Sequence, residues 1–250
     1  MRRSMSSLMV VAGLLIAACG GHPLAPPSTL GSGGRVAAPS PLAVPSTAPA
    51  SSIALAPTTI GVDELALSPD GPWRRVETAP GVRTPGLVYE LVPSMWVWLP
   101  VQEDVRHGIT WTFNRDDRPV IEAYLQARLT IVRSASALPI DYSDPGWARW
   151  FLDGGAAFRR ILQVREREGE RYSLDRGVVL RPVVYGEERT ADTAVVVDCT
   201  LDGGLWLRPD GTPGEGTSRG IAPVGIATRV RRVAGEWRIE HLAPQPEACQ

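Results

Sequence analysis

The chain has 250 residues, of which 44% are hydrophobic, and a formal net charge of -1 at neutral pH. This length and composition suffice for one well-formed hydrophobic core, so one globular domain with appendages is expected. The nearly neutral charge, with no basic tail, argues against a nucleic-acid-binding protein.

The N-terminus has the layout of a secretory signal. Arg2 and Arg3 precede an apolar run from Leu8 to Ile16, which is too short to span a bilayer as a lasting helix. The run ends in Ile16-Ala17-Ala18-Cys19, which resembles the lipobox of bacterial lipoproteins. That resemblance implies that residues 1–18 are a lipoprotein signal peptide and that the Cys19 thiol receives the lipid. The chain would then be anchored to the extracytoplasmic side of the cell membrane. The alternative is an ordinary cleaved signal with an incidental cysteine.

Residues 19–59 are rich in Pro, Ala, Ser and Gly and carry almost no charge. Such a composition cannot bury enough apolar surface to offset the entropy lost on ordering, so it predicts a disordered, partly polyproline-like tether. The tether would hold the folded part of the chain clear of the membrane.

Residues 60–112 are expected to form an N-terminal extension with short strands that lies along the main domain. Residues Leu87 to Leu99 form an apolar run, and the strand-forming residues bounded by Pro93 and Pro100 predict a short strand. Tryptophans recur in this segment, and they either form an aromatic binding patch or pack in the core and along a sheet edge: Trp73, Trp96, Trp98 and Trp111.

Three helices are predicted after Asn114. The first is capped by Asp116 or Asp117, has Pro119 in its first turn and carries apolar residues at helical spacing to about Ser134. The second opens at Asp144-Pro145, and the third runs from about Gly154 to Glu168 and stops at Gly169.

The rest of the chain has the pattern of strands separated by turns. The predicted strands are Val178 to Tyr185, Ala194 to Leu201, Val224 to Val233 and Trp237 to Leu242. A two-residue turn at Ala234-Gly235 would place Val230, Trp237 and Ile239 on the buried face and Arg229 opposite Glu240. The Gly-rich stretch from Leu205 to Gly220 is interpreted as a mobile hairpin tip.

Two cysteines, Cys199 and Cys249, lie in the folded part of the chain. An even pair in an exported domain indicates a disulfide, and the alternative is a pair of free buried thiols.

The order of three helices followed by a curled sheet resembles the nuclear transport factor two-like superfamily over roughly residues 113–249. The chain also resembles a group of actinobacterial cell-envelope lipoproteins with this domain, in Ile121-Glu122-Ala123-Tyr124, Asp144-Pro145, Val197-Asp198-Cys199, Gly235-Glu236-Trp237 and Cys249. The resemblance implies an α+β fold in residues 113–250, in which three helices pack in the concavity of a curved antiparallel sheet. It implies no assigned activity.

The superfamily includes isomerase-like and dehydratase-like enzymes, so catalytic candidates must be considered. Asp198, Tyr124 and His241 are the candidates, because such chemistry needs a carboxylate or imidazole base in an apolar cone and a donor over the developing oxyanion. Alternation along the last strand would put His241 on the core face with Trp237 and Ile239. In the alternative interpretation, Asp198 and His241 are hydrogen-bonded packing residues.

The sequence therefore predicts a non-catalytic accessory lipoprotein that binds a protein partner or an apolar envelope molecule. A small-molecule isomerase or hydratase and a purely structural spacer are the alternatives. No cofactor or metal site is expected, since the three histidines, His22, His107 and His241, are scattered. The polar outer face of the last hairpin is consistent with a monomer or weak dimer.

Overall fold

The computed structural model describes residues 66–83, 85–100, 104–106, 109–111, 115–215, 217 and 220–249. The predicted signal peptide, the lipid site at Cys19 and the tether lie outside these residues. Within the described part of the chain, no helix is both long and apolar enough to cross a membrane.

The helices occupy the centre of the chain, as predicted. A single 3-10 turn, η1 (Arg115–Asp117), leads into the long helix α2 (Arg118–Ser136), and α3 (Gly146–Trp150) and α4 (Ala156–Arg167) follow. Asp117 stands at the N-cap of α2 without a side-chain capping bond, and its carboxylate accepts a 3.1 Å hydrogen bond from Arg189 Nε. Two further 3-10 turns are η2 (Gly186–Glu188) and η3 (Pro246–Cys249).

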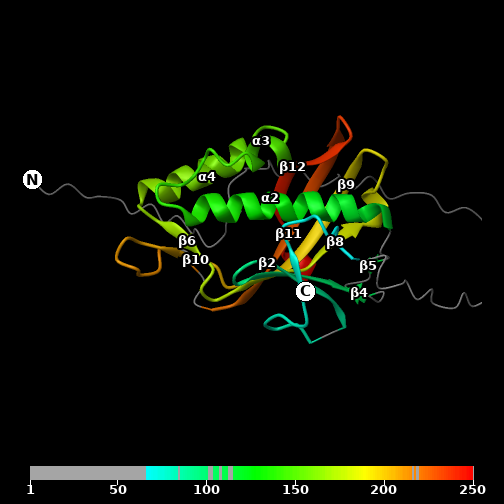
Figure 1. Ribbon diagram of the computed structural model, residues 1–250, viewed down its shortest axis with the longest axis horizontal. Helices are drawn as coiled ribbons and strands as arrows, with labels where there is room; N and C mark the ends of the chain where they lie inside the picture. Colours follow the sequence, from blue (N-terminus) through cyan, green and yellow to red (C-terminus); the bar gives the residue numbers. More distant parts are fainter. Residues whose placement is uncertain are drawn as a thin grey trace, which may run out of the picture. The chain divides into compact units, whose positions relative to one another are not determined.

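An eight-stranded sheet forms the second layer, in the order β1-β2-β3-β7-β9-β11-β12, with β8 also paired to β9. Its strands are β1 (Arg74–Val76), β2 (Gly86–Val92), β3 (Met95–Pro100), β7 (Val178–Leu180), β8 (Pro182–Tyr185), β9 (Thr193–Asp202), β11 (Ala222–Val233) and β12 (Glu236–Pro244). Two small pairs join β10 (Leu205–Leu207) to β6 (Arg171–Ser173) and β4 (Asp104–Arg106) to β5 (Ile109–Trp111). The fold is thus α+β, with one long helix crossing a curved sheet (Figure 1).

The strands predicted after Tyr172 that join this sheet pair antiparallel with one another, as expected, but the sheet as a whole is mixed because N-terminal strands join it. The short strand predicted between Pro93 and Pro100 is confirmed as β3, and the residues before it form β2, which a turn at Ser94 with a φ of 67° joins to β3. Strand β3 pairs with β7 in parallel, whereas the other pairs are antiparallel. The helical region between these two strands is long enough for the crossover that a parallel pair requires. The first three strands therefore belong to the same sheet as the later ones.

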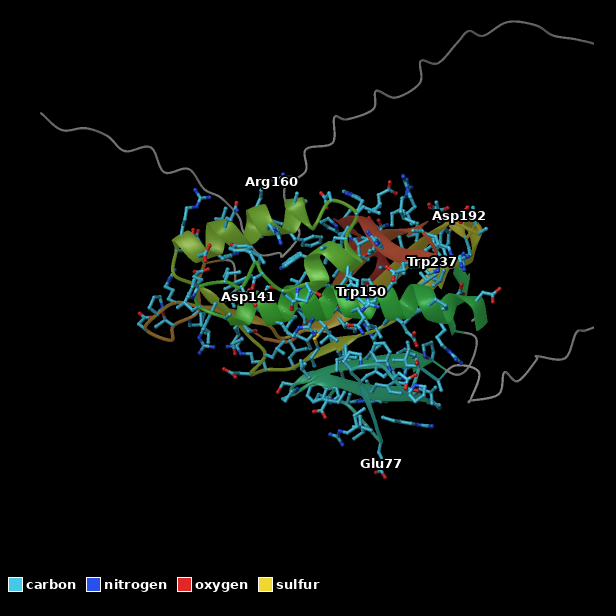
Figure 2. All side chains as sticks on the ribbon, turned by 45° about the horizontal axis from the view of Figure 1, so that its top comes forward. Glu77, Asp141, Trp150, Arg160, Asp192 and Trp237 are labelled. Atoms are coloured by element: carbon cyan, nitrogen blue, oxygen red, sulfur yellow. A yellow bond between two sulfur atoms is a disulfide. The ribbon has the colours of Figure 1, made fainter. Side chains whose placement is uncertain are left out.

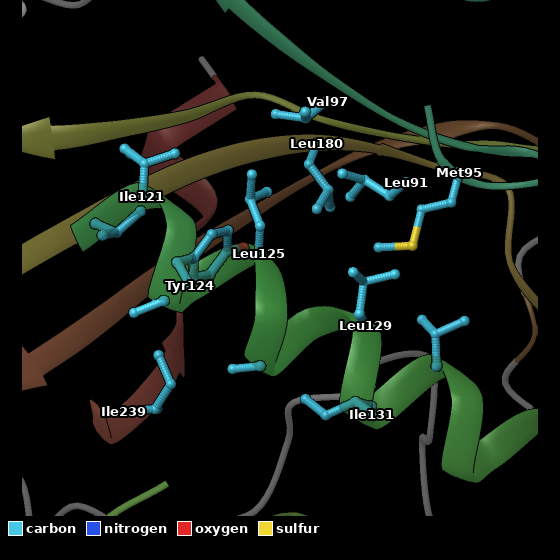
Figure 3. Packing of buried hydrophobic residues seen from close by; sticks show 14 of the residues in the cluster. Leu91, Met95, Val97, Ile121, Tyr124, Leu125, Leu129, Ile131, Leu180 and Ile239 are labelled. Atoms are coloured by element: carbon cyan, nitrogen blue, oxygen red, sulfur yellow. The ribbon is translucent and has the colours of Figure 1, made fainter. Parts of the chain in front are cut away.

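The core lies between α2 and the sheet. Leu125 and Leu129 point from α2 toward Val97 and Leu180, whereas Ile131 points away from those strands (Figure 3). All of these side chains are at most 6% exposed. Helices α3 and α4 cover the side of α2 that the sheet leaves open (Figure 1). Most of the surface of α2 is therefore buried, which explains why apolar residues occur around most of this helix.

The last hairpin confirms one part of the predicted register and corrects another. Val230, Trp237 and Ile239 are all buried, and Ala234 and Gly235 form the two-residue turn with positive φ at both positions. However, the register shifts after Arg229, which lies opposite His241 rather than Glu240. The extra residue in β12 reverses the alternation beyond it, so His241 is exposed and not on the core face.

The stretch after β9 is also more ordered than a mobile hairpin tip. Its first residues, Leu205 to Leu207, form strand β10 and are buried, with Trp206 against Tyr172 at a ring-centroid distance of 5.3 Å. The buried Arg165 side chain reaches across to the Glu215 carbonyl oxygen at 3.2 Å and to Glu170 at 2.8 Å. These contacts attach the loop to α4, which the glycine content alone did not reveal.

Candidate functional site

Two of the three predicted catalytic candidates meet in the interior of the fold. Tyr124 points from the middle of α2, and Asp198 projects from the inner face of β9, where alternation puts Val197 and Cys199 on the other face. The Tyr124 hydroxyl donates a 2.6 Å hydrogen bond to Asp198 Oδ2. Both side chains are 0% exposed. His241, the third candidate, is exposed on β12 and is not part of this cluster.

Arg128 completes this buried cluster, and the sequence analysis did not single it out. It lies one helical turn after Tyr124 and donates a 3.3 Å hydrogen bond to the Tyr124 hydroxyl. Asp198 also accepts a 2.7 Å hydrogen bond from the Arg181 backbone N–H through its other oxygen. A charged residue on the apolar stripe of α2 was the signal that could have indicated Arg128.

Removal from solvent is the main influence on the pKa of the Asp198 carboxyl group in this cluster. Burial raises the pKa of Asp198, and the positive charge of Arg128 and the hydrogen bonds from Tyr124 and Arg181 only partly oppose that rise. Burial likewise raises the pKa of Tyr124 well above 10.0, so the phenol stays protonated and acts as a donor. The Asp198 carboxylate is satisfied internally, because each of its oxygens already has a donor.

A separate, open groove of about 310 Å³ lies on another side of α2. Four elements build it: the segment before β1, the N-terminal half of α2, helix α3 and the β11–β12 turn. Its lining includes three tryptophans, three carboxylates, one guanidinium and one amide, namely Trp73, Trp150, Trp237, Asp70, Glu122, Glu236, Arg149 and Gln126. Trp150 lies on α3 and Trp237 on β12, and both belong to the same lining (Figure 2).

Local contacts hold the groove walls in place. Trp73 Nε1 donates a 2.7 Å hydrogen bond to the Ser68 carbonyl oxygen, and the Ser68 N–H donates one of 2.6 Å to Glu122 Oε1 on α2. Helix α3 approaches α2 closely at Gly146, where a Cβ would lie 2.0 Å from Thr130 Oγ1. This approach brings Arg149 and Trp150 to the same lining as Gln126.

The aromatic patch considered from sequence is not the one that forms. Trp98 is 2% exposed and packs in a small second cluster with Val88 and Val179, with Trp96 beside it. Trp73 belongs instead with the partly buried residues of the main core, and the side chain of Trp111 lies outside the described residues. Trp73 is therefore separated from the Trp96–Trp98 pair, and the three groove tryptophans come from distant segments.

The predicted disulfide between Cys199 and Cys249 is confirmed, with an S–S distance of 2.02 Å. It attaches the C-terminal turn η3 to β9. The residue before η3, Gln245, crosses directly over Gly225 of β11. The Gln245 N–H donates a 2.8 Å hydrogen bond to the Gly225 carbonyl oxygen. Among the described residues, no three His, Cys, Asp or Glu side chains cluster so that they could hold a metal ion.

Comparison with known proteins gives little beyond the fold described above. No protein-family model matches the sequence, and no curated protein matches it significantly. One solved structure, of a proposed aromatic ring hydroxylase from Novosphingobium aromaticivorans, aligns with 56% of this chain and 100% of its own at 14% identity. Its TM-score is 0.35, so the likeness assigns neither a family nor an activity.

Proposed function

We propose that this chain is a non-catalytic accessory lipoprotein, anchored by Cys19 at the outer face of the cell membrane, whose folded part binds a partner in the tryptophan-lined groove. The observation that carries the proposal is a contrast between two places in the molecule. The best-placed carboxylate, Asp198, is sealed and fully hydrogen-bonded, whereas the groove is open and lined by aromatic and charged groups.

The nuclear transport factor two-like fold is part of this proposal. Three helices precede most of the sheet, and the longest of them, α2, contacts β8, β9, β11 and β12 across the inner face. Folds of this kind host many unrelated functions, so the site and not the fold must carry the functional argument.

Photo-crosslinking in the cells that make the protein tests the binding role. A photoreactive residue replaces Arg149 in the groove, and a matched variant carries it at Arg160, an exposed position on α4 that does not line the groove (Figure 2). Adducts of defined mass from position 149 and none from 160 are expected. Equal adducts from both positions, or none from position 149, would contradict binding in the groove.

A small-molecule isomerase or hydratase is the second candidate function, and the Tyr124–Asp198 pair favours it. A carboxylate with a raised pKa next to a phenol donor is the arrangement that proton abstraction beside a carbonyl needs. Against it, both groups are 0% exposed, so a substrate would have to open the core. Turnover of small cyclic ketones or enones by the wild type, and its loss in Asp198→Asn, would establish this function in place of the first.

The oligomeric state proposed is a monomer or a weak dimer. The outer face of the last hairpin carries ion pairs between Arg231 and Glu240 and between Arg238 and Glu236, and such a charged face is costly to cover. Light scattering on the protein without its signal peptide is expected to give the mass of one chain, or a dimer that dissociates on dilution.

A further inference from the structure

We propose that the groove takes a cationic group, the guanidinium or ammonium of an Arg or Lys, presented by a basic segment of a partner protein. The inference rests on the proposed function, since it names the chemistry of the partner that the groove would bind. Two features of the groove support it, its charge and its tryptophans, and Arg149 provides a test of it.

The charge of the groove favours a cation. Asp70, Glu122 and Glu236 line it together with a single guanidinium, that of Arg149. Glu236 pairs with Arg238, which lies outside the lining, at 3.4 Å. Asp70 and Glu122 have no ion pair among the described residues, and Glu122 receives only the neutral Ser68 N–H. An anionic ligand would meet like charge here, whereas a cation would supply the missing partner.

The tryptophans of the groove already bind guanidinium groups within the chain. Arg149 Cζ lies 4.6 Å from the centroid of the Trp150 ring, and Arg189 Cζ lies 4.8 Å from that of Trp237. Both distances are within the range at which an indole attracts a cation. Trp73 has no such guanidinium among the described residues, and its hydrogen bond to Ser68 fixes the ring in place. Trp73 thus offers a fixed indole close to the unpaired carboxylates.

Arg149 is an internal competitor for the same position. Its side chain is exposed, has no carboxylate partner in the described part of the chain, and covers Trp150. A cation that enters the groove must meet this charge or displace it from the ring. Removing Arg149 should therefore tighten the binding of a cationic ligand, which is the opposite of what removing an ordinary contact residue does.

The open shape of the groove favours a segment of a protein over a free small cation. Four elements line a space of about 310 Å³. When one side chain of the partner enters this space, the partner residues before and after it would contact the rim of the groove. A small free cation would bury little surface there and would still lose its translational freedom. Arginine is also among the residues that most often anchor protein interfaces.

The test uses the full-length protein and three matched peptides of Gly and Ser that carry several Arg, Gln or Glu residues. Tryptophan fluorescence and titration calorimetry measure the affinities, and a neutral glucose oligomer serves as a further probe. The Arg peptide is expected to bind at least about tenfold more tightly than the Gln peptide, as two ion pairs and one cation–π contact would give, and to weaken with added salt. The Glu peptide should not bind.

Variants locate the effect in the groove. Asp70→Asn with Glu122→Gln should weaken the Arg peptide about tenfold, while the amide oxygen introduced by Glu122→Gln can still accept the Ser68 N–H. Arg149→Ala should tighten it about threefold. Glu77→Gln is the matched control, because Glu77 is an exposed carboxylate remote from the groove, and it should change nothing (Figure 2).

Three results would overturn the inference, and the first two are equal binding of the Arg and Gln peptides and weaker binding of the Arg peptide by Arg149→Ala. Binding of the glucose oligomer with unchanged affinity in the carboxylate variants would also overturn it, while the groove would remain a binding surface. Failure of the proposed function itself has a different signature, the absence of crosslinks from position 149.

Discussion

The Tyr124 hydroxyl and the Asp198 carboxylate are joined by a 2.6 Å hydrogen bond inside the protein, between helix α2 and strand β9. The two residues are separated by 74 positions in sequence, so the contact connects the two layers of the fold. Arg128 adds a positive charge beside it, and Arg181 adds a backbone N–H. A buried polar cluster that is satisfied in this way specifies one alignment of helix and sheet, because a slipped helix would leave a buried carboxylate without its donor.

Tyr124→Phe removes the hydroxyl from this cluster and should lower the free energy of unfolding by about 1–3 kcal/mol, the usual cost of an unsatisfied buried polar group. Urea unfolding, followed by circular dichroism, measures the change. Tyr185→Phe is the matched control, since that hydroxyl bonds only to Glu187 on the surface and its loss should cost little. Equal losses of unfolding free energy in the two variants would show that the buried hydrogen bond contributes no more to stability than the exposed one.

The stability of the protein should depend on the titration of Asp198. Its pKa is raised above the ordinary value of 3.8 in the folded state, so the folded protein holds a proton that the unfolded chain releases. The contribution of Asp198 to stability is therefore largest below 3.8 and falls as the pH rises through the raised pKa. The difference in unfolding free energy between wild type and Asp198→Asn should decrease over that interval. An increase with pH would contradict the raised pKa.

The bridge between Cys199 and Cys249 closes a loop with a sequence separation of 50. Its loss should lower the free energy of unfolding by about 4 kcal/mol in the chain-entropy estimate. Urea unfolding with and without reductant measures this, and the double variant Cys199→Ser with Cys249→Ser should not respond to reductant. A mass that does not rise by two hydrogens on reduction would refute the bridge in the purified protein.

Gly225→Ala tests how closely the C-terminal tail crosses the sheet. A Cβ at position 225 would lie 1.8 Å from the Gln245 carbonyl oxygen, a backbone atom that cannot rotate away. The variant should lose about 1–3 kcal/mol of stability through overpacking. Gly186→Ala, where a Cβ would meet nothing within 4 Å, should be nearly neutral. Thermal unfolding of both variants gives the comparison.

Cys19→Ala tests the anchor that the lipobox resemblance implies. Labelled palmitate should enter the wild type and not the variant, and the variant should leave the membrane fraction. Incorporation of label into both proteins would refute lipidation at Cys19, and incorporation into neither would favour an ordinary cleaved signal.

Local signals in the sequence were sufficient for the parts of the fold that depend on neighbouring residues. Apolar spacing and Pro119 located α2, and positive φ at Ala234 and Gly235 follows from the two-residue turn expected there. The cysteine pair was also identified correctly. In each case the physical cause acts within a few residues, or depends only on the number of cysteines available.

Tertiary structure alone decided the rest, because the relevant partners are far apart in sequence. The bulge between β11 and β12 turned His241 outward, and no residue type there marked it beforehand. The parallel pairing of β3 with β7 made the sheet mixed. Trp73, Trp150 and Trp237 became one groove lining only when the segment before β1, α3 and the last hairpin met beside α2. A sequence shows which side chains are available, but the packing of helix against sheet determines which of them share a surface.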